Sequence, residues 1–189
     1  MIDAVGSKGY RAVSVADVLG EASVSRTTFY KHFDDKLDCF LAAYDVAVDE
    51  LVDSVQIGCD PRLVWSERVR AGLTRALELL AADPPLTRAV VVEIAAAGPA
   101  GQSRRAAMLD RLAALLDRDD APAAAGLPAN TAAMAAGAAL GLLFEEVEAG
   151  RTASLPDRLD DLLFAVLVPY MGPNAAGAET RPPLAPSPG

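Results

Sequence analysis

Apolar residues recur at three- and four-residue spacing along most of the chain, which is the periodicity of amphipathic α-helices. The helices that this pattern predicts, each with one apolar face, cover residues 35–56, 62–82, 102–118 and 155–171. Segment 86–97 is apolar on nearly every side, which is typical of a helix buried in the middle of a protein. Segment 131–149 predicts a helix with many small residues, which let helices approach closely. We therefore expect an all-α fold.

The N-terminal segment 14–36 predicts two short helices joined by a tight turn. Ser14 is placed to N-cap the first helix, with Asp17 three residues later as a shortened capping box. Ser25 can accept hydrogen bonds from the free N–H groups that open the second helix, residues 26–33. The segment is therefore a helix-turn-helix, followed by the start of the long helix that links it to the rest of the chain.

The second helix of this motif has an apolar side and a polar side. Phe29 and Phe33 anchor the apolar side, while the opposite side carries hydroxyl, cationic and imidazole groups of the kinds that bind phosphates and base edges. These polar residues are Arg26, Thr27, Thr28, Tyr30, Lys31 and His32. We expect this helix to contact DNA.

Residues 9–36, GYRAVSVADVLGEASVSRTTFYKHFDDK, resemble the DNA-binding domain of the TetR family of one-component transcriptional regulators. The shared pattern is a Gly-aromatic pair, a short helix, and a recognition helix that ends in Tyr-x-His-Phe before a Lys. Only residues 1–8 precede this pair, so the first helix is shorter than in the family, and a start codon upstream of Met1 would explain it. Ser23 stands where the family commonly has glycine; if Ser23 is left-handed, serine costs roughly 1 kcal/mol relative to glycine.

The resemblance implies a homodimer that places two recognition helices in successive major grooves of a pseudo-palindromic operator, about 34 Å apart. The residues expected to read bases are Arg26, Thr27 and Lys31. Those expected to hold phosphates are Thr28, Tyr30, His32 and Lys36, with Ser14 at the start of the preceding helix.

The resemblance also implies a DNA-binding domain at residues 1–45 and a helical ligand-binding and dimerisation body at 46–172, before a disordered tail at 173–189 that is rich in Pro, Ala and Gly. A small, mainly apolar effector is expected between the long linking helix and the body, lined by Tyr44, Trp65, Val69, Leu73, Glu93, Met108, Leu112 and Phe144. The aromatic residues of this set fit either a cavity wall or an ordinary core. The last two helices resemble the family's dimerisation pair, with Ala133, Ala136, Gly137, Leu140, Leu159, Leu163 and Val166 at the interface.

Glu93 lies in an apolar segment, where a carboxylate is costly unless it is paired. One interpretation is an internal ion pair with an arginine, for which the candidates are Arg68, Arg75 and Arg104. The other is that Glu93 faces a cavity and fixes a polar or cationic ligand.

Composition limits the classes of protein that fit. The chain has 189 residues, 52% of them hydrophobic, which is ample for a small head and a larger body. Its net charge of −9 argues against general affinity for nucleic acid, so DNA binding must be local, with few phosphate contacts and modest salt dependence. Cys39 and Cys59 form no C-x-x-C motif, and no apolar run is long enough to cross a bilayer, so we expect a cytoplasmic protein without a membrane partner.

No pattern indicates catalysis, a cofactor or a metal site. The single histidine, His32, has no nucleophile or carboxylate partner at motif spacing, and the chain has no H-E-x-x-H, G-x-S-x-G or Walker loop. The acidic cluster Glu145, Glu146 and Glu148 is expected to be a solvated face, since no His or Cys is near it. We therefore expect a DNA-binding transcriptional regulator, a ligand-responsive repressor, and not an enzyme. The alternative is a ligand-binding or scaffolding helical dimer whose short, charge-balanced head grips DNA weakly.

Overall fold

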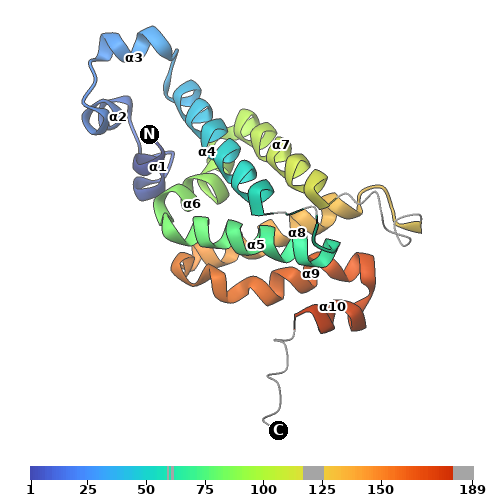
Figure 1. Cartoon of the computed structure of the whole chain (residues 1–189). Helices are drawn as coiled ribbons and strands as arrows, with labels where there is room; N and C mark the ends of the chain where they lie inside the picture. Colours follow the sequence, from blue (N-terminus) through green and yellow to red (C-terminus); the bar gives the residue numbers. More distant parts are fainter. Residues whose placement is uncertain (59, 61, 117–125, 181–189) are drawn as a thin grey trace.

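The computed structural model describes residues 1–58, 60, 62–116 and 126–180, and these residues form helices and no strand (Figure 1). The N-terminal elements are α1 (Ile2–Lys8), α2 (Val15–Ala22), α3 (Arg26–His32) and α4 (Lys36–Gly58). The next elements are α5 (Trp65–Ala82), α6 (Pro84–Val91), the 3₁₀ helix η1 (Glu93–Ala97), α7 (Gly98–Leu116) and α8 (Thr131–Glu148). The last are the 3₁₀ helix η3 (Thr152–Arg158), α9 (Leu159–Met171) and α10 (Pro173–Glu179). The predicted all-α class, with a helix-turn-helix before a helical body, is confirmed.

The fold is a small head on a larger helical body, and α4 joins the two (Figure 1). In the head, α3 lies at the end farthest from the body, and α4 runs from there into the body. Inside the body α4 packs against α5, α6 and α7. The predicted division of the chain after residue 45 falls within α4 and stays a prediction.

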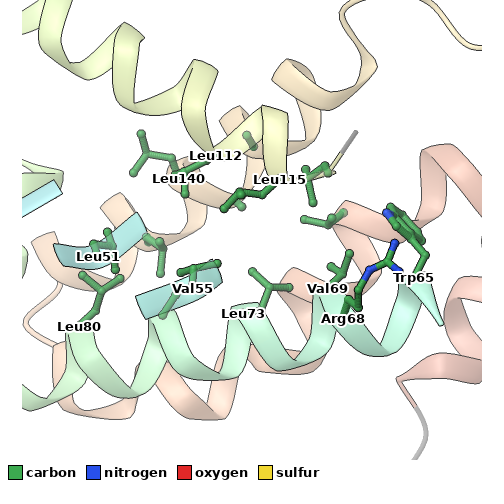
Figure 2. Close-up of a pocket in the computed structure, with 17 residues that line it drawn as sticks. Leu51, Val55, Trp65, Arg68, Val69, Leu73, Leu80, Leu112, Leu115 and Leu140 are labelled. Carbon is green, nitrogen blue, oxygen red and sulfur yellow. The ribbon is translucent and has the colours of Figure 1, made fainter. Parts of the chain in front are cut away.

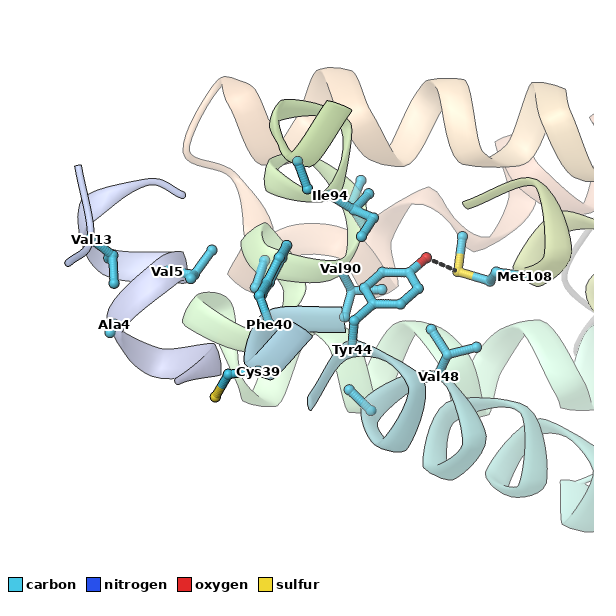
Figure 3. Close-up of a cluster of buried hydrophobic side chains, with 14 of the residues drawn as sticks. Ala4, Val5, Val13, Cys39, Phe40, Tyr44, Val48, Val90, Ile94 and Met108 are labelled. Carbon is cyan, nitrogen blue, oxygen red and sulfur yellow. Dashed lines mark hydrogen bonds between the residues drawn. The ribbon is translucent and has the colours of Figure 1, made fainter. Parts of the chain in front are cut away.

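One apolar core crosses from head to body along α4. Phe40 and Tyr44 of α4 are fully buried, in one cluster with Val5 of the head and Val90 of the body (Figure 3). The Tyr44 hydroxyl donates a hydrogen bond to the sulfur of Met108 at 3.4 Å. Burial raises the pKa of Tyr44 well above its usual value. Because the cluster is continuous, the head and the body share their packing through α4.

The short first helix is held by a close approach to α6. Ala4, Val5 and Gly6 of α1 are buried. A Cβ atom on Gly6 would lie 1.9 Å from the backbone oxygen of Pro85, so glycine is the residue that fits there. The predicted short first helix is confirmed, and its contact with the body supplements the thin layer behind α2 and α3.

The apolar segment 86–97 was predicted to be a single helix. In the structure it is the end of α6 followed by η1. Gly98 ends η1 as its C-cap, with φ 75°, and is also the first residue of α7, while Gly101 lies in the first turn of α7. The sequence pattern does not distinguish one α-helix from an α-helix followed by a 3₁₀ turn, because the run has no strong helix breaker and both arrangements bury the same residues.

The predicted disordered tail begins as a helix. α10 packs against α9, Ala176 is buried, and Arg70 of α5 donates a hydrogen bond to the backbone oxygen of Glu179. Composition missed this helix because Pro173, in its first turn, is compatible with a helix start. Residues 181–189 of the predicted tail lie outside the described part of the chain.

One side chain of the predicted acidic face, Glu146, is buried, whereas the face was expected to be in water. Cys39 is buried, while Cys59 lies outside the described residues. Glu146 is not part of a solvated face: it is buried and accepts a hydrogen bond from Nε of Arg151 at 2.8 Å, which lowers its pKa. In the described ranges, no group of three or more His, Cys, Asp or Glu side chains could hold a metal ion. No helix among these residues has the length and hydropathy needed to span a bilayer.

Replacing Gly6 with alanine should lower the free energy of unfolding by about 1–3 kcal/mol, because the added methyl group must displace the Pro85 backbone. The matched control is Gly20→Ala in α2, where an added Cβ meets no atom within 4 Å. There alanine should stabilise the chain by up to about 1 kcal/mol through helix propensity alone. Urea denaturation followed by circular dichroism measures both. Equal effects of the two substitutions would contradict a close contact between α1 and α6.

Candidate nucleic-acid interface and ligand cavity

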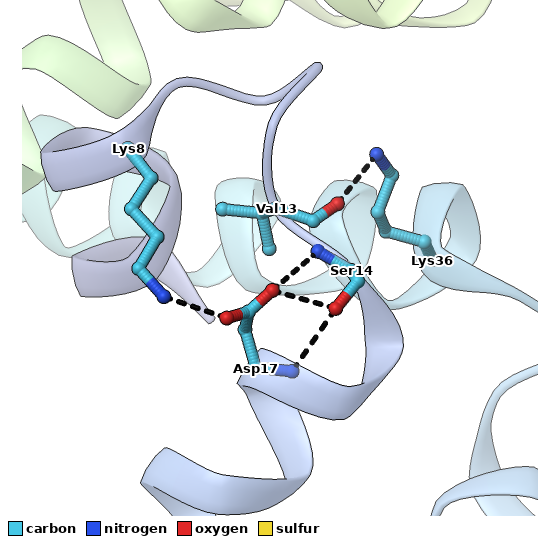
Figure 4. A network of polar contacts seen from close by, with 5 residues as sticks. All are labelled: Lys8, Val13, Ser14, Asp17 and Lys36. Carbon is cyan, nitrogen blue, oxygen red and sulfur yellow. Dashed lines mark hydrogen bonds and ion pairs between the residues drawn. The ribbon is translucent and has the colours of Figure 1, made fainter.

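The helix-turn-helix begins at a capping box. The Ser14 hydroxyl accepts a hydrogen bond from the Asp17 backbone N–H at 3.3 Å, and the Asp17 carboxylate accepts one from the Ser14 backbone N–H at 2.9 Å (Figure 4). Lys8 contacts the other carboxylate oxygen at 2.6 Å. The hydrogen bonds from Lys8 and then from Ser14 hold the pKa of Asp17 well below its usual range. The predicted N-cap is confirmed, while the contact of Ser14 with a phosphate stays a prediction.

The structure defines the conformation of the turn between α2 and α3, which the sequence left open. Ser23 is left-handed, with φ 53° and ψ 37°, so the cost of serine relative to glycine applies here. Ser25 N-caps α3, because its hydroxyl accepts a hydrogen bond from the Thr28 backbone N–H at 3.0 Å. These two serines set the angle between the helices with local contacts only.

The two sides of α3 divide as predicted. Phe29 is buried and Phe33 half-buried, with ring centroids 5.4 Å apart. The six polar residues predicted for the other side are all exposed: Arg26, Thr27, Thr28, Tyr30, Lys31 and His32. Within the described part of the chain, Arg26 and Lys31 take part in no ion pair. The far end of the head therefore presents two unpaired cations together with hydroxyl groups and an imidazole.

Lys36 has an internal role that the sequence did not indicate. Its ammonium donates hydrogen bonds to the backbone oxygens of Tyr10 and Val13, both at 2.8 Å, and lies 4.3 Å from the centroid of the Tyr10 ring. Gly9, just before Tyr10, has φ 83°, which other residues rarely adopt. The Gly-aromatic pair thus forms the turn that Lys36 holds. The phosphate contact of Lys36 stays a prediction.

An apolar cavity of about 140 Å³ lies inside the body, among α4, α5, α7, α8 and α9 (Figure 2). Leu51 and Val55 of α4 form part of its wall, and Ala136, Leu140 and Leu143 of α8 form another part. The lining is apolar apart from one arginine. Such a site favours an apolar ligand.

Half of the residues predicted to line the ligand site do line this cavity: Trp65, Val69, Leu73 and Leu112. Tyr44 and Met108 instead line a second hollow, of about 300 Å³, between α4 and α7. Glu93 and Phe144 line neither of these two spaces, so their contact with a ligand stays a prediction. Phe144 lies on the exposed side of α8. The sequence did not indicate this, because the helix is apolar on most sides and its periodicity selects no inward face.

Arg68 is the charged lining residue, and the sequence had indicated it only as a candidate partner of Glu93. Figure 2 shows its guanidinium beside Trp65 at one end of the cavity. Its Nη1 atom donates a hydrogen bond to the Leu63 backbone oxygen at 3.2 Å. The spacing from Trp65 could have revealed it, since residues three apart lie on the same side of a helix. The cavity therefore has one cationic end.

Glu93 is a paired buried carboxylate, as one of the two interpretations held. It is 9% exposed, lies 3.4 Å from Nε of Arg88, and accepts a hydrogen bond from the Tyr10 backbone N–H at 2.8 Å. None of the three predicted arginines is its partner. The start of η1 faces α6 and the head, a placement that the linear pattern does not contain.

The predicted dimer interface is also partly corrected. Four of its residues are buried within the chain: Ala136, Leu140, Leu163 and Val166. Leu159 and Gly137 are half-buried, and Ala133 is exposed. The large apolar side chains that α8 and α9 do expose are Met134, Phe144 and Phe164. Because α8 is apolar on most sides, the sequence did not show which residues face outward, and the predicted set lies about one residue along the helix from the exposed set.

A family model of known proteins matches the head of this chain. The family model for bacterial regulatory proteins of the tetR family matches residues 4–43, which include the capping box, the left-handed turn and α3. Residues 4–43 are therefore similar to the N-terminal domain of the tetR family. The transcriptional activator FasR of Mycolicibacterium smegmatis is 29% identical to this chain over 76 residues. That alignment covers 40% of this chain and only 35% of FasR.

Solved structures extend the similarity to the body. FadR from Bacillus subtilis, in complex with stearoyl-CoA, has a TM-score of 0.73 at 14% identity, over 90% of this chain and 94% of FadR. A tetR-family regulatory protein from Rhodococcus RHA1 has a TM-score of 0.66 at 17% identity, over 87% and 92% of the two chains. The similarity of fold to these two structures therefore includes the body helices that the family model does not reach.

Proposed function

We propose that this chain is a DNA-binding transcriptional regulator, a ligand-responsive repressor that acts as a homodimer, and not an enzyme. The observation that carries the proposal is the exposed polar side of α3, with unpaired Arg26 and Lys31, at the far end of a TetR-type head. Arg26, Thr27 and Lys31 read bases in the major groove. Thr28, Tyr30 and His32 hold phosphates, with Ser14 and Lys36 behind them.

The proposed dimer forms through the outer faces of α8 and α9. Met134, Phe144 and Phe164 are large apolar residues that these faces leave in water. Ala133 and Gly137 on the same side of α8 are small, so two such helices can approach closely. This set replaces the residues that are buried within one chain. A two-fold pair would place two copies of α3 about 34 Å apart, one turn of DNA.

The proposed effector is a small, mainly apolar molecule bound in the cavity. A volume of about 140 Å³ is similar to that of an engineered apolar cavity, about 150 Å³, that stays dry and binds benzene. FadR is similar in fold and is known with stearoyl-CoA, whose acyl chain is longer than this cavity can hold. An acyl ligand would therefore widen the body and move α4, whose first residue lies in the head. Binding would favour the conformation that no longer spans the operator.

Selection from random double-stranded DNA should return a pseudo-palindrome, and Arg26→Ala should relax the preference at one base pair by roughly 1–3 kcal/mol. The control is Arg62→Ala in the body, which removes an equally charged, exposed side chain paired with Asp60. Affinities for the selected and for scrambled DNA at two salt concentrations give the comparison. Selection of no sequence would instead favour the alternative, a ligand-binding or scaffolding dimer with a weak head.

A charge on the outer face of α8 should separate the dimer. Met134→Glu should weaken self-association by at least about 1 kcal/mol, because a carboxylate would be buried without a partner. Val46→Glu on α4 is the matched control, since Val46 is 58% and Met134 60% exposed. Sedimentation equilibrium measures both variants. A wild-type monomer, or a dimer that Met134→Glu leaves intact, would contradict this interface.

Added bulk in the cavity should compete with ligand. Ala136→Leu should weaken stearoyl-CoA binding by about 1–3 kcal/mol, because the larger side chain occupies the cavity wall. Ala114→Leu, at an exposed position of α7, is the control and should leave binding unchanged. Isothermal titration calorimetry measures the affinity. Equal affinities for the two variants would place the ligand elsewhere.

A further inference from the structure

A buried carboxylate joins the body to the turn between α1 and α2. Oε2 of Glu93, the first residue of η1, accepts a hydrogen bond from the Tyr10 backbone N–H at 2.8 Å. The other oxygen, Oε1, lies 3.4 Å from Nε of Arg88 in α6. A carboxylate at this depth is costly without partners, and these two contacts supply them. Glu93 thus fixes the position of the Tyr10 turn relative to α6.

Arg88 extends this contact to α8. Its Nη2 atom lies 2.9 Å from a carboxylate oxygen of Glu148, the last residue of α8, while Nε of the same guanidinium faces Glu93. Leu140 and Leu143 of α8 line the cavity, and the helix between them and Glu148 is unbroken. A displacement of this cavity wall is therefore also a displacement of the group that holds Arg88.

Lys36 completes the connection on the other side of the head. It donates a hydrogen bond to the Tyr10 backbone oxygen and begins α4, which lines another part of the cavity with Leu51 and Val55. A series of polar contacts thus runs from α8 through the head turn to α4, through Glu148, Arg88, Glu93, Tyr10 and Lys36. We call this series the α8–head–α4 link.

We propose that the α8–head–α4 link couples the width of the cavity to the position of the head, with Glu93 as the positioning residue. A hydrogen bond to a charged group weakens steeply when its geometry changes. A ligand that separates α8 from α4 must break the link or carry the Tyr10 turn with it. Breaking it would leave a buried charge unpaired, so the turn moves. This inference rests on the proposed function for its biological meaning.

The test is a double-mutant cycle read by hydrogen exchange at the backbone amides of residues 9–13, in the full chain without DNA or ligand. Ala136→Leu perturbs the cavity wall, and Glu93→Gln keeps the shape of the side chain but removes its charge. Glu93→Gln alone should speed exchange at the Tyr10 amide about tenfold. Ala136→Leu should change exchange at residues 9–13 by at least about twofold when Glu93 is present, and not in the Glu93→Gln background.

Two controls separate coupling from general destabilisation. Asp49→Asn breaks an exposed ion pair with Arg111 between α4 and α7, outside the link, and should leave the Ala136→Leu effect unchanged. Exchange in α9 should be the same in all variants. If Ala136→Leu also speeds hydrogen exchange in α9, it is replaced in the cycle by Leu143→Ala, which removes a side chain from the same cavity wall. Equal effects of the wall substitution in both backgrounds, or no effect on residues 9–13, would overturn the link.

A functional arm distinguishes failure of the link from failure of the proposed function. With selected DNA and stearoyl-CoA as probes, the ligand should weaken DNA binding by the wild type and change it by less than about twofold in Glu93→Gln. A full response in the variant would overturn the coupling. A wild type that ignores stearoyl-CoA would count against that ligand, and the exchange cycle would then decide the link alone.

Discussion

The continuous packing along α4 is the constraint on which the rest of the structure depends. Its first residue, Lys36, holds the head turn, its middle residues Phe40 and Tyr44 fill the shared core, and its later residues Leu51 and Val55 line the cavity. Protein interiors are packed as densely as organic crystals and transmit strain, so a shift at one end of such a helix is felt by the residues packed along it. A single helix therefore gives the head and the cavity a common mechanical element.

Electrostatics divides the basic residues of the head into two groups. Lys8 is bound to Asp17, and Lys36 is bound to two backbone oxygens, so both stabilise the head from within. The unpaired cations on α3 are left to face a partner. In a chain of net charge −9, this arrangement would keep nonspecific attraction to DNA low, and under the proposed function recognition would depend on the shape and contacts of one short helix.

The head could be predicted from the sequence because its structure is decided locally. Ser14, Ser23 and Ser25 act on residues at most five positions away, so spacing alone identified the caps and the turn. Trp65, Val69, Leu73 and Leu112 of the cavity lining were predicted, because their helices each have one apolar face. The outer face of α8 could not be predicted, because a helix that is apolar on most sides does not show which side meets which neighbour. Glu93 shows both cases: burial indicated that it is paired, but its hydrogen-bond donor at Tyr10 is 83 residues away in sequence.

The small size of the cavity has a consequence for sensitivity to any large effector. At about 140 Å³, the closed body is not the form that would accommodate a long acyl chain, so only the fraction of molecules in a wider form is competent to bind. The apparent dissociation constant is the intrinsic one divided by that fraction. The ligand concentration at which the protein responds is then set by the equilibrium between its closed and wider forms without ligand. Substitutions far from the ligand, at the contact of α1 with α6 for example, can tune that threshold without changing a single lining residue.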